Sequence, residues 1–372
     1  MNPAFWPGRR VLVTGHTGFK GGWLSLWLQH WGAEVTGYAL APPTAPSLFE
    51  TARIGEGMQS ILGDVRDFAA LRAALLNCRP EIVFHLAAQP LVAPSYQQPV
   101  ETYATNIMGT VHLLEAVRQV GGVRAVVNVT SDKCYANQEW LWGYRENEPM
   151  GGDDPYSSSK GCAELVTAAY RASFFPPTDD AQHGVALASA RAGNVIGGGD
   201  WAAYRLIPDL IRAFQAGRPA PIRCPEAVRP WQHVLEPLSG YLMLAEQLWD
   251  AGSAFAESWN FGPVETDARP VHWLADRFVA LWGNGAKWVM DGEPHVHEAH
   301  YLKLDCAKAW EKLLWSPRWN LERALAETVN WYQAHQAGAD MQAVTLAQIE
   351  QFQGSGNAVM QVLERIQMEA MV

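Results

Sequence analysis

The fold of this chain is decided by the stretch Val11-Leu12-Val13-Thr14-Gly15-His16-Thr17-Gly18-Phe19-Lys20-Gly21. An apolar run leads into spaced glycines, and residues 23–28 then show helical apolar spacing. A strand, a glycine turn and a helix in this order are what a dinucleotide-binding fingerprint requires. Gly15 permits the tight turn, Gly18 lets the backbone approach a pyrophosphate, and Gly21 lets the helix lie close to the strand. The stretch therefore predicts a nucleotide site near the start of the chain.

A second stretch, Tyr156-Ser157-Ser158-Ser159-Lys160, carries reactive side chains. Tyr156 and Lys160 lie one turn apart on one face of a helix that Pro155 is suited to begin. The pKa of a free tyrosine is about 10, whereas a lysine cation, a nicotinamide cation and the helix dipole all favour the phenolate. We therefore expect the pKa of Tyr156 to fall towards about 7, which takes about 4 kcal/mol of differential stabilisation. An isolated tyrosine–lysine pair at this spacing more often lies on a solvent-exposed helix face. The glycine turn earlier in the chain favours a catalytic role for this pair.

Strand-like and helix-like segments alternate along most of the chain, which predicts a Rossmann-type, doubly wound parallel α/β sheet. We expect residues 1–190 to form the nucleotide-binding domain, with residues 235–262 returning to it. Residues 191–340 form a smaller, mainly substrate-binding domain, and residues 341–372 form a tail. Residues 42–57 read as a loop and residues 97–120 as one helix. The expected strands are residues 11–13, 34–39, 61–67, 81–86, 125–130, 185–188 and 258–261, and the further helices are residues 68–76, 237–249, 274–282 and 321–335.

Composition excludes several other classes of protein. The net charge of −10 argues against a nucleic-acid partner. No apolar run approaches the roughly 18 residues of a membrane span, and residues 1–10 hold no secretory signal. Five scattered cysteines suit a reducing compartment, so we expect a cytoplasmic protein. His295, His297 and His300 lack the cysteine or helix partners of a metal site, so we expect none.

The chain contains four recognisable motifs, in this order: Gly15 to Leu24, Thr130 to Tyr135, Arg191 to Trp201 and Arg229 to Val234. Together they resemble the CDP-glucose 4,6-dehydratases, a family within the extended short-chain dehydrogenase/reductase superfamily. The resemblance extends from the N-terminus to about residue 335, and Lys20 and Lys133 are its most specific features. It implies a lyase that converts CDP-glucose to CDP-4-keto-6-deoxyglucose for surface polysaccharides such as the O-antigen.

The cofactor implied by the resemblance is NAD. The residues alone do not choose between NAD and NADP, because residues 38–43 contain neither an acid for the ribose hydroxyls nor an arginine cluster. Lys20 is long enough to reach a phosphate, Asp64 resembles the acid on the adenine side, and the small Ala87 and Ala88 let a flat cofactor pass. The predicted cofactor-binding residues are Gly15, Thr17, Gly18, Phe19, Lys20, Gly21, Asp64, Val65, Leu86, Ala87, Ala88, Tyr156 and Lys160.

Ser131, Tyr156 and Lys160 suit removal of a proton from an alcohol while its carbon gives a hydride to nicotinamide. A ketone formed at carbon 4 acidifies the hydrogen on carbon 5, so a base and an acid could then eliminate the carbon 6 hydroxyl as water. By resemblance, Asp132 is the acid. Lys133 is either the base or a polariser near carbon 5, and the residues do not decide which.

Arg229 resembles the arginine that binds the substrate pyrophosphate. Asn194 and Arg205 are further substrate-binding candidates, as are Trp201 and Trp231.

Relatives imply a homodimer through residues 103–118 and 156–171. One alternative is another sugar-nucleotide dehydratase or an epimerase, against which Lys133 speaks. A second is a non-catalytic NAD(P)-sensing regulator, which would not need Ser131, Tyr156 and Lys160.

Overall fold

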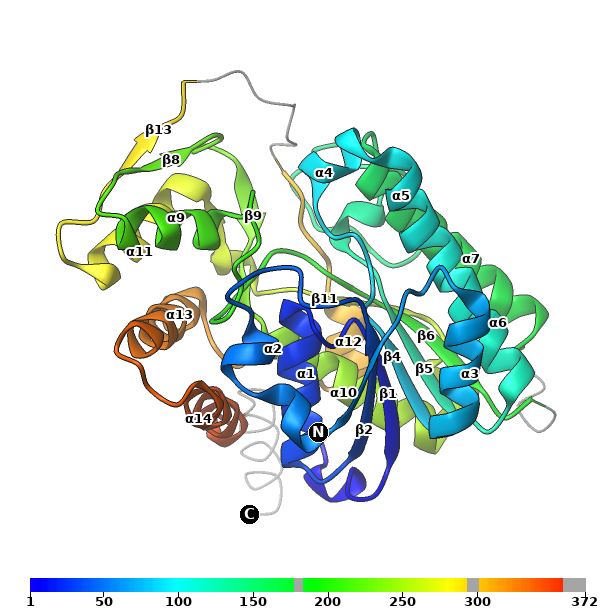
Figure 1. Ribbon diagram of the computed structural model, residues 1–372. Helices are drawn as coiled ribbons and strands as arrows, with labels where there is room; N and C mark the ends of the chain where they lie inside the picture. Colours follow the sequence, from blue (N-terminus) through cyan, green and yellow to red (C-terminus); the bar gives the residue numbers. More distant parts are fainter. Residues whose placement is uncertain (177–182, 293–300, 357–372) are drawn as a thin grey trace, which may run out of the picture.

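The computed structural model describes residues 1–176, 183–292 and 301–356 (Figure 1). At its centre is a seven-stranded sheet in the order β11-β6-β5-β4-β1-β2-β3. Every neighbouring pair in it runs parallel, as the alternation of strands and helices predicted. Its strands are β1 (Arg10–Thr14), β2 (Glu34–Ala39), β3 (Gln59–Leu62), β4 (Ile82–His85), β5 (Ala125–Val129), β6 (Ala186–Ala192) and β11 (Ser258–Phe261).

Helices cover both faces of this sheet (Figure 1). On one face lie α3 (Phe68–Cys78), α6 (Gly109–Val120) and α7 (Pro155–Ser173), and on the other lie α1 (Phe19–His30) and α10 (Leu235–Ala251). Successive strand residues point to opposite faces, so Leu12 enters one apolar core while Val11 and Val13 enter the other. A parallel sheet buried on both sides needs such apolar runs, which explains why the first strand could be read from sequence.

A smaller lobe lies beside the carboxyl edge of the sheet, and α9 (Leu206–Gln215) and α11 (Val271–Trp282) belong to it (Figure 1). Strand β11 pairs with β6, so residues 258–261 join the sheet formed by the N-terminal strands. The assignment of residues 235–262 to the first domain stays a prediction. The outer limits of the two predicted domains stay a prediction. Three small strand pairs complete the part of the chain described: β7 (Val195–Ile196) with β10 (Gln232–His233), β9 (Val228–Pro230) with β12 (Ala268–Pro270), and β8 (Ala220–Ile222) with β13 (Trp288–Met290).

The prediction of a plain loop over residues 42–57 was wrong. This stretch contains α2 (Leu48–Thr51) and a 3-10 turn, η2 (Ile54–Gly57). Leu48 and Ile54 are buried against α1, where a Cβ at Gly22 would stand 3.1 Å from both side chains. Tertiary packing on a glycine of another helix, which local spacing does not reveal, folds this segment.

The predicted helix over residues 97–120 is interrupted. It comprises α5 (Pro99–Tyr103), a π-helical turn η3 (Ala104–Met108) and α6. Asn106 in the π turn accepts a hydrogen bond from the Gln89 amide at 2.8 Å and donates one to the Ser159 hydroxyl at 2.8 Å. The irregular turn thus ties the loop after β4 to the helix that carries Tyr156.

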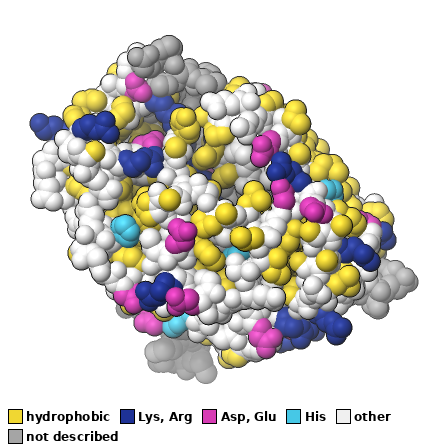
Figure 2. Space-filling model, viewed as in Figure 1, with side chains coloured by type: hydrophobic (Ala, Val, Ile, Leu, Met, Phe, Trp, Pro, Cys, Tyr) yellow, Lys and Arg dark blue, Asp and Glu magenta, His cyan; other side chains and the backbone are white. Residues whose placement is uncertain are grey.

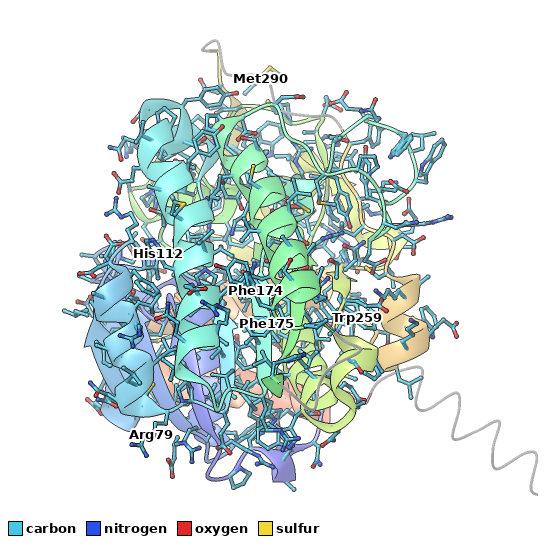
Figure 3. The ribbon with its side chains drawn as sticks, turned by 90° about the vertical axis from the view of Figure 1, so that its right-hand side faces the viewer. Arg79, His112, Phe174, Phe175, Trp259 and Met290 are labelled. Atoms are coloured by element: carbon cyan, nitrogen blue, oxygen red, sulfur yellow. The ribbon has the colours of Figure 1, made fainter. Side chains whose placement is uncertain are left out.

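Exposed apolar side chains gather on the side of the molecule where α3, α6 and α7 lie (Figure 2). Figure 3 shows these helices side by side on that face. The apolar side chains that α5, η3 and α7 expose there are Val100, Tyr103, Met108 and Leu165.

Of the last described helices, α14 (Met341–Gly354) packs against α1, and α13 (Leu321–Gln336) packs against α14 and α11. The Phe352 ring lies against Trp27 and Trp319, at centroid distances of 5.7 and 5.2 Å. Residues 357–372 of the predicted tail lie outside the described residues. Among the described helices, none has the length and apolar character that a membrane span requires.

The remaining helices of the described ranges are η1 (Pro3–Phe5), α4 (Val92–Gln97), η4 (Asp132–Cys134), η6 (Gly252–Phe255), η7 (Glu265–Asp267) and α12 (Ala307–Leu313).

Truncating Phe352 tests whether α14 is an integral part of the fold. Because this ring is fully buried between two tryptophans, Phe352→Ala should lower the free energy of unfolding by about 3–5 kcal/mol. Trp310, which is 49% exposed on α12, is the control, and Trp310→Ala should cost about 0.5 kcal/mol or less. Denaturant unfolding of both variants measures this, and equal effects would mean that α14 is only loosely attached.

Candidate active site

One cavity of about 1550 Å³ lies at the carboxyl edge of the sheet, between the sheet and the smaller lobe. Every site residue that the sequence predicted lines this cavity, including residues more than 200 positions apart. Parallel strands end at the same edge, which brings the loops after β1, β3, β4 and β5 together. The lining residues predicted from sequence are Gly15, Thr17, Gly18, Phe19, Lys20, Gly21, Asp64, Val65, Leu86, Ala87, Ala88, Ser131, Asp132, Lys133, Tyr156, Lys160, Asn194, Arg205 and Arg229.

The glycine turn fits a bound dinucleotide. Gly15 has φ +78, and a Cβ there would stand 2.8 Å from the Ala87 nitrogen; a Cβ at Gly21 would stand 2.1 Å from the Gly15 oxygen. Helix α1 begins after Gly18 without any side-chain cap, so its first amides are available to a phosphate in the cavity. The backbone therefore forms the cradle that the fingerprint predicted.

Thr14 joins two strand ends next to this turn. Its hydroxyl makes a 2.7 Å hydrogen bond with the His85 Nδ1 and accepts hydrogen bonds from the Leu86 and Ala87 amides, each at 3.2 Å. Thr14 was not among the predicted site residues. Its position directly before Gly15 was the only feature of the sequence that indicated a role beside the glycine turn.

The end of β2 has no acid, as the sequence indicated. Leu40 and Ala41 line the cavity there, and the Thr17 hydroxyl donates to the Leu40 carbonyl at 2.9 Å. Asp64, after β3, also lines the cavity, but its carboxylate accepts hydrogen bonds from the Arg66 guanidinium at 2.9 and 2.5 Å. That pairing lowers the pKa of Asp64 and keeps it ionised.

Ser131 and Asp132 form a compact polar unit directly after β5. The Ser131 hydroxyl donates to Asp132 Oδ1 at 3.0 Å and accepts from the Lys133 amide at 3.2 Å. Asp132 is 2% exposed, and its Oδ2 has no hydrogen-bond partner among the described atoms. Burial raises the pKa of Asp132, against the opposing charges of Lys133, Lys20 and Arg229. A raised pKa suits a carboxyl that donates a proton.

The expected lowering of the Tyr156 pKa was wrong for the protein by itself. Burial raises the pKa of Tyr156 to about 12, and a hydrogen bond to Ser131 offsets this only in part. Lys160 Nζ donates to the Val129 carbonyl at 3.5 Å, and burial lowers its pKa to about 8. Burial disfavours the charged form of each group, and for Tyr156 this effect on the pKa exceeds the opposing effect of the Lys160 charge. The prediction of a lowered pKa depended on that charge prevailing.

Lys20 points towards the reactive groups. Burial lowers its pKa to about 8, with Arg205 and Lys160 lowering it further and Asp132 opposing them. Arg205 donates to the Asp200 carboxylate at 2.9 Å, and its positive charge also acts on the Tyr156 phenol. Both cations therefore act through their charges on the groups proposed to react.

Some of the remaining sequence candidates line the cavity, and others do not. Arg229, in β9, is 7% exposed at the cavity wall, and Trp201 and Trp231 line the same wall. Cys134 is fully buried, and burial raises the pKa of its thiol, so it packs as a small apolar side chain. No group of metal-binding side chains occurs among the described residues, while His295, His297 and His300 lie outside them.

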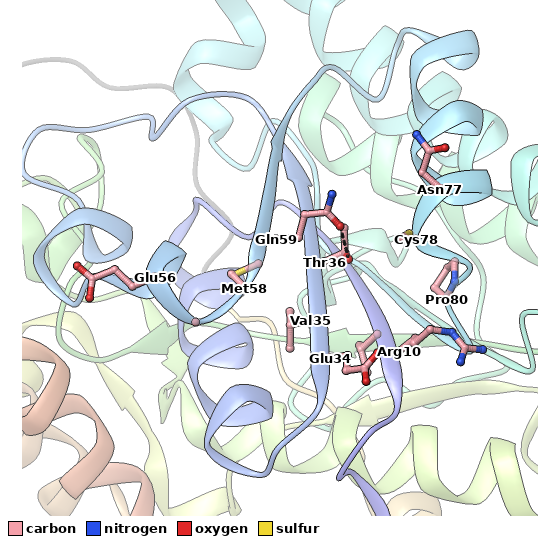
Figure 4. A pocket seen from close by; sticks show the side chains of 12 residues that line it. Arg10, Glu34, Val35, Thr36, Glu56, Met58, Gln59, Asn77, Cys78 and Pro80 are labelled. Atoms are coloured by element: carbon pink, nitrogen blue, oxygen red, sulfur yellow. Dashed lines mark hydrogen bonds between the residues drawn. The ribbon is translucent and has the colours of Figure 1, made fainter.

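A second cavity of about 580 Å³ lies at the opposite, amino end of β1 and β2. Its polar side chains do not converge, since Glu56 and Asn77 point away from one another (Figure 4). The hydrogen bond drawn across it joins Thr36 to Gln59 at 3.5 Å. We therefore place the active site at the carboxyl edge.

The family follows from comparison with known proteins. A family model described as GDP-mannose 4,6 dehydratase matches residues 12–262. The CDP-glucose 4,6-dehydratase of Salmonella typhimurium is 62% identical over 337 residues, which cover 91% of this chain and 94% of that protein. The chain belongs to the CDP-glucose 4,6-dehydratase family.

Solved structures of related enzymes share the fold of this CDP-glucose 4,6-dehydratase family member. The dTDP-glucose 4,6-dehydratase of Bacillus anthracis in complex with NAD has a TM-score of 0.72 at 22% identity, covering 90% of this chain and 100% of that chain. MoeE5 in complex with UDP-glucose and NAD has a TM-score of 0.72 at 27% identity, covering 88% and 99%. Both agree with the extended short-chain dehydrogenase/reductase architecture that the motifs indicated.

The buried Asp132 carboxyl gives a pH-dependent stability prediction. Its folded pKa lies above its unfolded value, so its stabilising contribution is complete below about pH 4 and is lost as the pH rises through the folded pKa. Asp132→Asn should therefore raise the midpoint of thermal unfolding at pH 7 and change it little at pH 3. Calorimetry at the two pH values measures this. A lower midpoint at pH 7 would show that the neighbouring cations stabilise the carboxylate more than burial destabilises it.

Proposed function

We propose that this protein is an NAD-dependent CDP-glucose 4,6-dehydratase, which makes CDP-4-keto-6-deoxyglucose and water. One observation carries the proposal: Asp132 and Lys133 lie in the same cavity as Ser131, Tyr156 and Lys160, at the carboxyl edge beside the glycine turn. A simple dehydrogenase has no use for an extra acid and a cation at that position. The name and high identity of the Salmonella relative support the assignment.

Oxidation at carbon 4 is the first task of these residues. Tyr156 accepts the proton of the carbon 4 hydroxyl, and Ser131 donates a hydrogen bond to the oxygen that becomes the ketone. Lys160 would favour the phenolate through its charge and would contact the ribose of the cofactor. When bound, NAD supplies the hydride acceptor at carbon 4, the hydride donor for carbon 6, and a positive charge that lowers the raised pKa of Tyr156.

Elimination of water is the second task. With its raised pKa, Asp132 can hold a proton and give it to the departing carbon 6 hydroxyl. Lys133 is half-buried at the cavity wall and acts on carbon 5, as base or as polariser of the ketone. Return of the hydride to carbon 6 and of a proton to carbon 5 would complete the product without net oxidation. Asp132 would regain a proton equivalent to the one that Tyr156 took from the carbon 4 hydroxyl.

Three polar side chains are proposed to hold the substrate. Arg229 is suited to the pyrophosphate because a guanidinium forms paired hydrogen bonds with phosphate oxygens. Arg205 and Asn194 line the wall nearer the reactive groups and would contact the sugar and nucleotide. Lys20 adds a further cation for a phosphate.

A homodimer and a cytoplasmic location complete the proposal. The dimer would form through the helices at residues 103–118 and 156–171, whose exposed side carries apolar residues such as Leu165, 60% exposed, and Met108, 46% exposed.

None of the five cysteines, all in described segments, forms a disulfide, which suits a reducing compartment such as the cytoplasm.

Substrate choice is tested by incubating the protein and NAD with CDP-, dTDP-, UDP- and GDP-glucose in parallel. CDP-glucose should give the keto sugar, detected by its absorbance in alkali and by mass spectrometry. The other three should react at least about 100-fold more slowly if nucleobase contacts discriminate among them. Faster turnover of another nucleotide would overturn the substrate assignment while leaving a dehydratase.

The division of roles is tested with two variants. Tyr156→Phe should slow oxidation by about 100-fold to 10,000-fold, because it removes the proton acceptor. Lys133→Ala should slow water loss by about 100-fold and oxidation by less than about 5-fold, so that oxidised sugar and reduced nicotinamide accumulate. Single-turnover absorbance of the reduced nicotinamide separates the two steps. Equal loss of both steps in Lys133→Ala would contradict the assignment of Lys133.

The dimer is tested at Leu165. Leu165→Glu places a charge in the proposed interface and should shift the protein from dimer to monomer in light scattering. Leu281, 41% exposed on α11, is the matched control, and Leu281→Glu should leave the mass unchanged. An unaltered dimer in the Leu165 variant would place the interface elsewhere.

A further inference from the structure

A buried ion pair lies directly beneath the reactive groups. Glu164 on α7 comes one helical turn after Lys160, and its Oε2 accepts a hydrogen bond from Arg191 Nη2 on β6 at 2.8 Å. Both side chains are 3% exposed or less. The reaction outlined above uses neither residue. A buried pair of this kind is costly to desolvate, so its presence calls for a reason beyond stability.

The pair holds both ends of the segment that carries Asp132 and Lys133. At one end, the Thr130 hydroxyl donates to Glu164 Oε1. At the other, Arg191 Nη1 donates to the Tyr135 hydroxyl at 2.7 Å, and the guanidinium lies 4.9 Å from the centre of that ring. The short turn between Thr130 and Tyr135 is therefore anchored twice to one ion pair.

Further hydrogen bonds fix the pair itself. The Ser189 hydroxyl donates to Glu164 Oε2 at 2.7 Å, and Arg191 Nη1 also donates to the Glu146 carbonyl at 3.0 Å. The Tyr135 hydroxyl in turn donates a hydrogen bond to Asn260 Oδ1 at 2.8 Å. Helix α7, strands β6 and β11 and the turn after β5 thus meet in one network, in which the carboxylate oxygens of Glu164 are fully engaged.

Glu164 also acts on the charge of Lys160. Burial lowers the pKa of Lys160, and the carboxylate of Glu164 is the main opposing influence. The other groups that face this lysine are Cys134 on η4, whose thiol pKa is raised by burial, His85 on β4, whose pKa is about 3, Lys20 on α1 and Tyr156 on α7. At neutral pH the thiol, the imidazole and the phenol are uncharged, so Glu164 supplies the negative charge that keeps Lys160 protonated.

We propose that Glu164 and Arg191 are positioning residues that couple the two catalytic segments. Through its charge, Glu164 maintains the ammonium of Lys160 that supports Tyr156. Through Thr130 and Tyr135, the pair holds Asp132 and Lys133 at the geometry needed for elimination. This role rests on the proposed dehydratase function, and it goes beyond it by assigning two residues that do not touch the substrate.

The charge effect is tested in protein without substrate. The chain contains seven lysines, so their side chains can be followed individually by NMR titration of protein carrying 13C-labelled lysine. In Glu164→Gln the amide keeps the size of the side chain but loses the charge, so the Lys160 titration should move to lower pH by about one unit or more. The alkaline limb of the rate of oxidation should move by the same amount.

Thr167→Val is the matched control for that experiment. Thr167 lies on the same helix, is fully buried and accepts a hydrogen bond from Asn128 Nδ2 at 2.7 Å, so the variant also loses a buried hydrogen bond. It should lose stability without moving the Lys160 titration. An unmoved titration in Glu164→Gln, or an equal movement in Thr167→Val, would overturn the charge effect whether or not CDP-glucose is the substrate.

The positioning effect is tested at Tyr135, because Tyr135→Phe keeps the ion pair intact and does not depend on folding of the Glu164 variant. It removes the hydroxyl that links Arg191 to Asn260 while keeping the ring, which stacks on Tyr144 at 5.1 Å. We expect kcat to fall by about 10-fold or more with KM changed less than about 2-fold, and water loss to slow more than oxidation.

Tyr144→Phe is the control, since its hydroxyl donates to Asn137 Oδ1 at 2.9 Å and lies outside the network. It should leave kcat within about 2-fold of the unaltered protein. A Tyr135→Phe enzyme that matches this control, or one in which KM rises with kcat unchanged, would overturn the positioning role. Each comparison uses whichever nucleotide sugar the unaltered enzyme turns over, so failure of the CDP-glucose assignment would be recognised separately.

Discussion

A parallel sheet ends all of its strands at one edge, and the active site of this protein depends on that constraint. The glycine turn, the small residues after β4 and the polar turn after β5 come from separate parts of the sequence, yet β1, β4 and β5 are neighbours in the sheet. The side chain of Thr14 reinforces this arrangement because it binds the first amides after β4. Loops that start from adjacent strands can then surround one ligand without any long connection.

Burial controls the electrostatics of the cavity. It raises the pKa of Asp132 and of Tyr156 and lowers that of Lys160, so each group is shifted towards its neutral form. For Asp132 this shift favours the proposed proton donor. For Tyr156 it opposes the proposed proton acceptor, so the positive charge of the bound cofactor becomes part of the catalytic requirement. In the proposal above, Glu164 offsets part of this effect by favouring the charged form of Lys160.

Much of this architecture follows from short-range patterns. The apolar run at residues 11–13 and the spacing of Gly15, Gly18 and Gly21 predicted β1, the turn and α1, because a strand buried on both faces and a close helix crossing leave few other choices. The pair Tyr156 and Lys160 was recognisable since helical spacing places residues four apart on one face. Where packing on a distant element decides the conformation, as for α2 against Gly22, local patterns predicted a loop and were wrong.

The sequence by itself determined the fold class and the family and singled out the candidate reactive side chains, because these depend on periodicity and on motifs of adjacent residues. Only the tertiary structure decided the protonation preferences of Asp132, Tyr156 and Lys160, since burial is a property of the whole surrounding packing. It alone revealed the Glu164–Arg191 pair, whose members lie on different elements and have no sequence motif that joins them. Desolvation and long-range pairing act through space, and neither can be measured along the chain.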